Sequence, residues 1–199
     1  MKIVIVGANG DIGQAVCREL GDRHDLIQVG RSTGDIQMDM SDLNSIADMY
    51  TRVGSLDAVI VTAGDVCFKP LDEHTPESML FGLQQKLMGQ INLVLMGLKR
   101  LNANGSFTLT SGILDRDPVR TGTGAATANA GLGGFVKSAA IEMPLGLRIN
   151  VVSPGILDVS VPRYGASFPG HVPVSSLRVG RAFAKSVEGA MTGQVITVD

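Results

Sequence analysis

The feature that most constrains the fold of this chain is a set of three glycines placed directly after a short apolar run. Residues 3–6 read Ile-Val-Ile-Val, and Gly7, Gly10 and Gly13 follow at a spacing of three. Glycines between a strand and a helix let backbone N–H groups approach the phosphates of a ligand at the positive end of the helix. An ordinary glycine-rich turn does not explain this regular spacing, so we predict a dinucleotide-binding turn. The residues expected to contact the ligand are Gly7, Asn9, Gly10, Asp11, Ile12 and Gly13.

Strand-like apolar runs alternate with helix-like segments along the rest of the chain. The predicted strands lie near 2–6, 26–29, 35–38, 57–61, 105–111, 147–152 and 194–198. The predicted helices lie near 11–20, 42–52, 76–100, 122–143 and 175–188. Continuous apolar character is typical of parallel strands that are covered on both faces, and the alternation implies right-handed crossovers. We therefore predict an α/β fold, a doubly wound parallel sheet of about seven strands with helices on both faces, in a single domain over residues 1–199. The Pro- and Gly-rich stretch 156–174 is expected to be a loop.

Composition and charge exclude several classes of protein. The net charge is −2 and no stripe of Lys and Arg runs along the chain, so we expect no nucleic-acid partner. The apolar start is too short for a signal peptide or a spanning helix, so we expect no membrane partner. Cys17 and Cys67 are too few for a disulfide framework and suit the cytoplasm, where we place the protein. His24 and His74 stand in polar turns, and we expect no metal site.

The residues after the second predicted strand indicate which dinucleotide is bound. An NAD site usually places a carboxylate there to accept a hydrogen bond from the ribose 2′-hydroxyl. This chain has Arg31 and Ser32 instead, and a guanidinium can form two hydrogen bonds with a 2′-phosphate. We therefore predict NADP(H) as the cofactor, the alternative being that Arg31 is a solvated surface residue.

Four further segments resemble motifs of the short-chain dehydrogenase/reductase family. They read Asp-Met-Ser-Asp at 39–42, Thr-Ala-Gly at 62–64, Asn-Val-Val-Ser-Pro-Gly at 150–155 and Thr-Gly-Gln-Val-Ile-Thr-Val-Asp at 192–199. Together with the glycine turn, the resemblance covers nearly the whole chain and implies the Rossmann fold. It also implies further cofactor contacts at Asp39, Met40, Ala63, Gly64, Pro154, Gly155 and Ile156.

The catalytic residues that the resemblance implies are not present in this chain. Members of the family carry a Tyr and, four residues later, a Lys on one helix face, and these positions fall at Ala125 and Asn129. Neither side chain can exchange a proton near neutral pH. The two tyrosines of the chain, Tyr50 and Tyr164, lie elsewhere, so no shift of register restores the pair. The chain is therefore expected to be an atypical member.

Two other residues are candidates for catalysis. The family's Ser position falls at Gly112 or Ser111, and its Asn position falls at Lys86. A lysine in a dry pocket can have a lowered pKa and act as a proton donor. The alternatives are that Ser111 caps a turn and that Lys86 bridges backbone carbonyls. Tyr164 and His171, in the loop after Pro154-Gly155, are further possible donors.

Two functions remain open from the sequence. The first is an NADPH-dependent oxidoreductase that reduces a small carbonyl compound through Lys86 and Ser111. The second is a non-catalytic NADP(H)-binding sensor or regulatory protein with a degenerate active site. Because members of the family pair two of their helices across a two-fold axis, the resemblance also implies a homodimer or higher homo-oligomer.

Overall fold

The computed structural model describes residues 1–199 and contains one seven-stranded sheet in which every pair of neighbours is parallel. The strand order is β3-β2-β1-β4-β5-β6-β7. The strands are β1 (Lys2–Val6), β2 (Asp25–Gly30), β3 (Ile36–Gln37), β4 (Leu56–Val61), β5 (Leu101–Thr110), β6 (Arg148–Pro154) and β7 (Val195–Val198). This arrangement confirms the predicted doubly wound parallel sheet.

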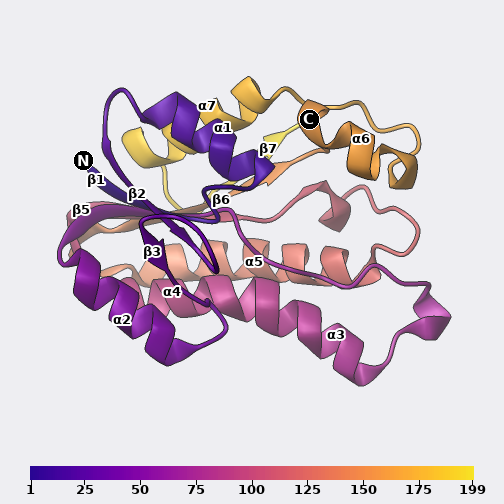
Figure 1. Cartoon of the computed structure of the whole chain (residues 1–199), viewed down its shortest axis with the longest axis horizontal. Coiled ribbons are helices and arrows are strands. Elements are labelled where there is room, and N and C mark those ends of the chain that lie inside the picture. Colours follow the sequence, from indigo (N-terminus) through magenta and orange to yellow (C-terminus); the bar gives the residue numbers. More distant parts are fainter.

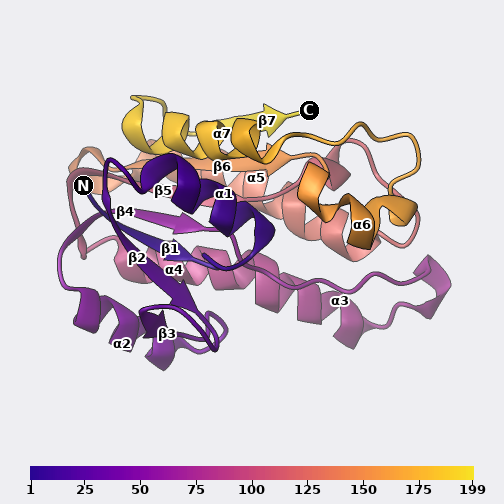
Figure 2. The ribbon, with the colours of Figure 1, turned by 45° about the horizontal axis from the view of Figure 1, so that its top comes forward.

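Helices cover both faces of the sheet (Figures 1 and 2). On one face lie α1 (Asp11–Leu20), α7 (Ser176–Glu188) and the short α6 (Val161–Tyr164). On the other face lie α2 (Leu43–Val53), α3 (Pro76–Gly82), α4 (Gly89–Gly97) and α5 (Thr123–Glu142). None of these helices combines the length and the continuous apolar character that crossing a bilayer requires.

The two layers of the core follow from the alternation of side chains along each strand. In β1, Val4 and Val6 pack into the cluster beneath α2, α4 and α5, whereas Ile3 and Ile5 pack into the cluster beneath α1 and α7. All four side chains are buried. This two-sided burial explains why the sequence of the strand is an unbroken apolar run rather than an alternating one.

The strand order also fixes where a ligand can bind. The chain moves outward from β1 through β2 to β3, and then returns to place β4 on the other side of β1. The connections after β1 and β4 therefore diverge and leave a crevice beyond the carboxyl ends of these strands. The glycine turn after β1 lies at this point.

Several segments differ from the sequence prediction in detail, and β5, for example, begins at Leu101 rather than near residue 105. The predicted helix 76–100 begins with α3, continues through the π-helical segment Leu83–Met88 and ends with α4 at Gly97. In the π-helical segment the N–H of Gly89 bonds to the carbonyl of Gln84, five residues back, which sequence periodicity does not reveal. The stretch 156–174 was expected to be a loop but contains α6, flanked by 3₁₀ turns at Asp158–Ser160 and Gly165–Ser167.

A glycine of α4 provides a test of this packing. A Cβ added at Gly97 would lie 2.5 Å from Tyr50 Oη and 2.9 Å from the ring of Phe107, and both side chains are fully buried. We expect Gly97→Ala to lower the free energy of unfolding by about 1–3 kcal/mol, because the core must shift to accept the methyl group. Denaturant unfolding measures this change.

The matched control is Gly134→Ala on α5. Gly134 is exposed and an added Cβ there would meet nothing within 4 Å. This variant should raise the free energy of unfolding by roughly 0.5–1 kcal/mol, since alanine restricts the unfolded chain and favours the helix. Equal effects of the two substitutions would contradict the close approach at Gly97.

Candidate functional site

A cavity of about 660 Å³ lies beyond the carboxyl ends of the strands. It is bordered by the turns that follow β1, β2, β4, β5 and β6 and by the segment that contains α6. Its volume is within the range of about 300–1,000 Å³ that is usual for ligand pockets. The cavity therefore brings together residues from distant parts of the chain.

Most of the residues predicted to form the site line this cavity. They are Gly7, Asn9, Gly10, Asp11, Ile12, Arg31, Met40, Ala63, Gly64, Lys86, Ser111, Pro154, Gly155 and Ile156. Three predicted contacts do not line it: Gly13, Ser32 and Asp39. Gly13 is buried behind the turn, where an added Cβ would lie 2.2 Å from the Gly7 carbonyl oxygen, so its role is to let α1 approach the turn. Asp39 accepts hydrogen bonds from the backbone N–H and the hydroxyl of Ser41.

The glycine turn has a conformation that suits the binding of phosphate groups. Gly7 has φ of +87°, and its backbone is held by Thr62, whose Oγ1 donates to the carbonyl oxygens of Val6 and Gly7 at 3.0 Å. Gly10 is the N-cap of α1 and no side chain caps the helix. The first N–H groups of α1 therefore remain available at the positive end of the helix dipole. A dinucleotide fits this turn, because a phosphate group satisfies such N–H groups.

Arg31 lies at the end of the cavity that is formed by the turn after β2. Its side chain is 61% exposed, and its guanidinium makes only long contacts, 3.5 Å to Asp65 Oδ2 and 3.4 Å to Gln85 Oε1. Close by, the side-chain amide of Asn9 donates to Thr33 Oγ1 at 2.6 Å. The guanidinium can therefore turn toward an anionic group without losing a strong internal hydrogen bond.

Lys86 enters the cavity from the π-helical segment and reaches the end of β5. Its Nζ donates to the carbonyl oxygen of Ser111 at 3.2 Å. The stem of the lysine passes so close to Gly64 that a Cβ there would lie 2.7 Å from Lys86 Cγ. One turn further along the helix, the carboxamide of the buried Gln90 forms two hydrogen bonds of 2.9 Å with the backbone of Thr110. This pair of bonds fixes the position of the helix on β5 and so determines where Lys86 points.

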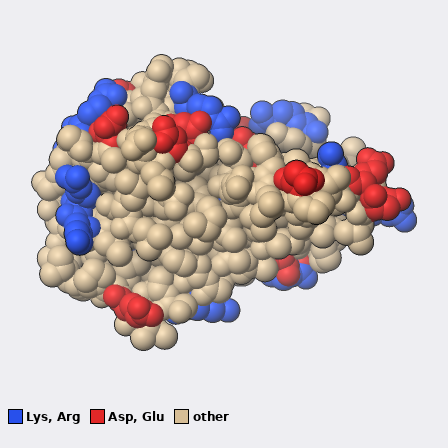
Figure 3. All heavy atoms as spheres, turned by 90° about the horizontal axis from the view of Figure 1, so that it is seen from below, with Lys and Arg blue, Asp and Glu red and all other residues tan.

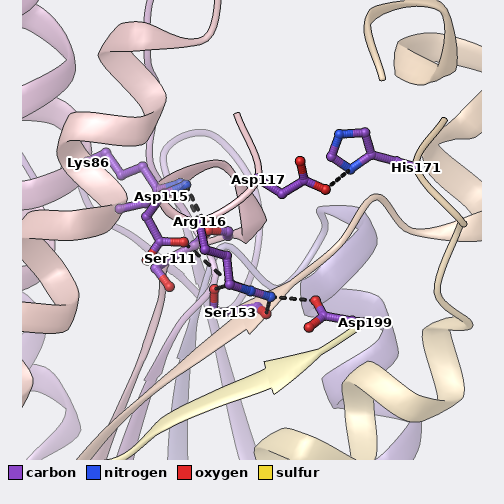
Figure 4. A network of polar contacts seen from close by, with 10 residues as sticks. Lys86, Ser111, Asp115, Arg116, Asp117, Ser153, His171 and Asp199 are labelled. Carbon is purple, nitrogen blue, oxygen red and sulfur yellow. Dashed lines mark hydrogen bonds and ion pairs between the residues drawn. The ribbon is translucent and has the colours of Figure 1, made fainter. Parts of the chain in front are cut away.

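The surroundings of Lys86 change its acidity. Burial lowers its pKa from 10.5 to about 8, and the nearby carboxylate of Asp115 partly opposes the change. Asp115 is held in place by its neighbour Arg116, which donates to Oγ of Ser153 at 2.6 Å and also pairs with Asp199 (Figure 4). Near neutral pH Lys86 is thus a cation that releases its proton more readily than an ordinary lysine.

Two polar atoms at this end of the cavity have no hydrogen-bond partner in the chain. They are Oγ of Ser111 and Oδ1 of Asn129, and these two residues are only 4% and 2% exposed. The amide nitrogen of Asn129 is used, because it donates to the carbonyl oxygen of Gly112 at 3.1 Å. Buried polar atoms without a partner are rare, and in a ligand cavity they indicate groups that bind the ligand or a water molecule.

The structure also locates the other residues that were considered for proton transfer. Ala125 and Asn129 stand one turn apart on α5, and both line the cavity. Tyr164 lines the cavity as well, whereas Tyr50 is buried in the core, where its hydroxyl donates to the Leu93 carbonyl. His171 does not line the cavity and faces Asp117, with Nδ1 and Oδ2 3.7 Å apart (Figure 4).

Sequence reasoning missed two residues that contact the glycine turn. Ser160 and Arg163 both donate a hydrogen bond to Asp11 Oδ2, and both line the cavity. These bonds hold the pKa of the Asp11 carboxyl below its usual value, with the Ser160 hydroxyl as the main cause. The signal that could have revealed them is the presence of an arginine and a serine in a segment otherwise rich in Pro and Gly.

The sequence of this chain is similar to those of known proteins. A family model described as enoyl-(acyl carrier protein) reductase matches residues 1–171. The short-chain dehydrogenase/reductase ucsE of Acremonium sp. is 26% identical over 188 residues, a match that covers 77% of this chain and 71% of that protein. An uncharacterized oxidoreductase of Schizosaccharomyces pombe is 28% identical over 173 residues, covering 78% of this chain and 66% of that protein. The chain thus spans about two thirds of the length of these relatives.

Solved structures agree with the fold over the whole chain. The protein lin1944 from Listeria innocua is 47% identical, with a TM-score of 0.99 and full coverage of both chains. A small-chain dehydrogenase in complex with NADPH is 26% identical, with a TM-score of 0.86 and coverage of 100% of this chain and 96% of that chain.

The pKa of Lys86 can be measured directly in the protein without ligands. In a ¹³C NMR titration of labelled lysines we expect the carbon next to Nζ of Lys86 to titrate near pH 8. Lys86→Met should remove that signal, and Asp115→Asn should move it to lower pH, because the carboxylate raises the pKa of Lys86. Titration of every lysine above pH 10 would contradict the burial of this amine.

Proposed function

Since this chain belongs to the short-chain dehydrogenase/reductase family of oxidoreductases, we propose that it reduces a small carbonyl compound with NADPH as the cofactor. The observation that carries the proposal is a single cavity. It is bordered by the glycine turn, by Arg31 at one end and by Lys86 with Ser111 at the other. The bound cofactor of the small-chain dehydrogenase with NADPH is consistent with it. We propose that residues 1–199 act as one NADP(H)-binding domain.

Different residues of the cavity bind different groups of the cofactor in this proposal. The open N–H groups of α1 bind phosphate oxygens, and Arg31 binds the 2′-phosphate that distinguishes NADPH from NADH. Ala63, Gly64 and the turn Pro154–Ile156 form walls of the same cavity. Asp39 lies outside the cavity, and the hydrogen bond from the Ser41 hydroxyl is the main cause that lowers the pKa of its carboxyl, with the charge of Arg31 as a smaller one.

The proposed reaction uses Lys86 as the proton donor. When bound, the reduced nicotinamide supplies the hydride that adds to the carbonyl carbon. Ser111 Oγ donates a hydrogen bond to the carbonyl oxygen, and the ammonium of Lys86 transfers its proton to that oxygen, so that an alcohol forms. The neutral amine regains a proton from water. A pKa of about 8 suits this role, because the acid form predominates near neutral pH and is still easily deprotonated.

A second candidate is a non-catalytic NADP(H)-binding sensor or regulatory protein. The observation that favours it is Ala125, which together with Asn129 gives α5 no proton-transferring side chain at the cavity. In this reading Lys86 is a structural residue that satisfies the Ser111 carbonyl at the end of β5. We propose an atypical member of the family in either case.

We also propose a homodimer or higher homo-oligomer. Figure 3 looks onto the helices below the sheet of Figure 1, and most of this face carries no charged side chain. Exposed apolar residues on these helices include Leu80, Met88, Leu95 and Ile141. Burial of such residues against a second copy would remove apolar surface from water.

The cofactor preference is tested with Arg31→Ala. We expect the Kd for NADPH to rise roughly 10- to 100-fold, because hydrogen bonds to a charged group usually contribute that much to affinity. The Kd for NADH should stay unchanged, since NADH has no 2′-phosphate. Fluorescence titration measures both constants. Arg52→Ala, which removes an exposed arginine of α2, is the control and should change neither. Equal binding of NADH and NADPH by the unmodified protein would overturn the preference.

Catalysis is tested by NADPH oxidation over a panel of aldehydes and ketones. We expect kcat/KM to fall as the pH rises through about 8, because the proton donor is lost. Lys86→Met should lower kcat about 10²- to 10⁴-fold and remove this pH dependence, Ser111→Ala should lower kcat by a smaller factor, and the exposed Lys99→Met should have no effect. Tight NADPH binding without turnover of any compound would favour the sensor.

A further inference from the structure

The contact between Asp11 and α6 joins two segments that are 152 residues apart in the chain. Asp11 is the first residue of α1 and lines the cavity next to Gly10. Its Oδ2 accepts hydrogen bonds from the hydroxyl of Ser160, at 2.5 Å, and from the guanidinium of Arg163. The segment that follows β6 is thereby attached to the turn that follows β1.

The carboxylate of Asp11 presents an electrostatic problem for the proposed cofactor. It carries a full negative charge near neutral pH, since its two partners lower its pKa. A dinucleotide that binds at the start of α1 brings the negative charge of a diphosphate to the same place. Two like charges at a few ångströms repel each other, and in a half-enclosed cavity the repulsion is stronger than in bulk water. A cation placed between them would relieve this repulsion.

Arg163 can supply this cation. Its guanidinium has five N–H donors, and the structure engages only Nη2, in the bond to Asp11. The side chain is 58% exposed and lines the same cavity as Gly7, Gly10 and Ile12. Asp11 and the stacking of the guanidinium over the ring of Tyr164, 5.4 Å from its centroid, keep the group in one position. The remaining donors can thus meet an anion without a rearrangement of the backbone.

We propose that Arg163 binds the diphosphate of the dinucleotide and that Asp11 is the positioning residue that holds it there. This inference rests on the proposed binding of a nicotinamide dinucleotide and assigns a residue for its central phosphates. Positive charge then lies at three places along the cavity: Arg31, Arg163 and Lys86. Arg163 also links occupancy of the cofactor site to α6, so that the ligand stabilises the segment that covers the cavity.

The proposal predicts that Arg163→Met affects ligands according to their phosphates. The probes are NADPH, NADH and ADP, which contain a diphosphate, and 2′-AMP, which does not. We expect the Kd of the first three to rise roughly 10- to 100-fold in this variant and that of 2′-AMP to stay the same. Arg31→Ala should give the reverse selectivity, weakening NADPH and 2′-AMP but not ADP. Isothermal titration calorimetry at low ionic strength measures all of these constants.

A double variant separates loss of contact from loss of structure. In Arg163→Met the Asp11 carboxylate is left facing the diphosphate without its cation, so adding Asp11→Asn should restore part of the ADP affinity. If Arg163→Met acted only by loosening α6, Asp11→Asn would loosen it further and restore nothing. Arg181→Met, an exposed arginine of α7 outside the cavity, makes the same change in net charge and should leave all four constants unaltered.

The outcomes distinguish this inference from the function on which it rests. Unchanged ADP and NADPH affinity in Arg163→Met would overturn the role of Arg163 and leave the cofactor assignment standing. Equal losses for ADP and 2′-AMP would also overturn it, because they would show general damage to the site. Failure of the unmodified protein to bind any of the dinucleotides would overturn the proposed function itself, and the inference with it.

Discussion

The site depends most on the paired hydrogen bonds between the Gln90 carboxamide and the backbone of Thr110. β4 ends at Val61, so the last residues of β5 extend beyond their neighbour on that side. The carboxamide donates to the carbonyl and accepts from the N–H of Thr110, as a further strand would do. Both groups are buried, and leaving them without partners would cost about 1–3 kcal/mol each. The helix that carries Lys86 is therefore fixed by the same bonds that complete the sheet.

The charges of the cavity are arranged as pairs rather than as a uniform field. Arg31 faces Asp65, Arg163 faces Asp11, and Lys86 lies near Asp115. Each cation thus has a carboxylate nearby and remains able to interact with an added anion. This arrangement agrees with a chain whose total charge is nearly balanced, since the local separation of charge, rather than the net value of −2, determines what the cavity can bind.

The fold could be predicted from the sequence because each strand is a continuous apolar run and the glycine turn marks the first crossover. The fold class is confirmed, and most of the predicted site residues line one cavity, because strand ends meet at one edge of a parallel sheet. The role of Arg163 could not be predicted, since its partner Asp11 lies near the other end of the chain and no periodicity relates them. Nor did spacing reveal that Gly13, Ser32 and Asp39 lie outside the cavity. Gly13, for example, is required by the close packing of α1 on the turn.

The π-helical segment Leu83–Met88 lies between α3 and α4 and changes the direction in which their side chains point. One additional residue in a turn rotates everything before it by about 100° relative to everything after it. Side chains that would share one face of a regular helix therefore point in different directions on α3 and on α4, although the helix axis is continuous in Figure 1. Loss of a single residue between these helices would turn α3 by that angle while the bonds between Gln90 and Thr110 kept α4 in place. Related chains that differ by one residue here would therefore share their sheet and α4 and turn a different face of α3 toward α5, which α3 contacts in this structure.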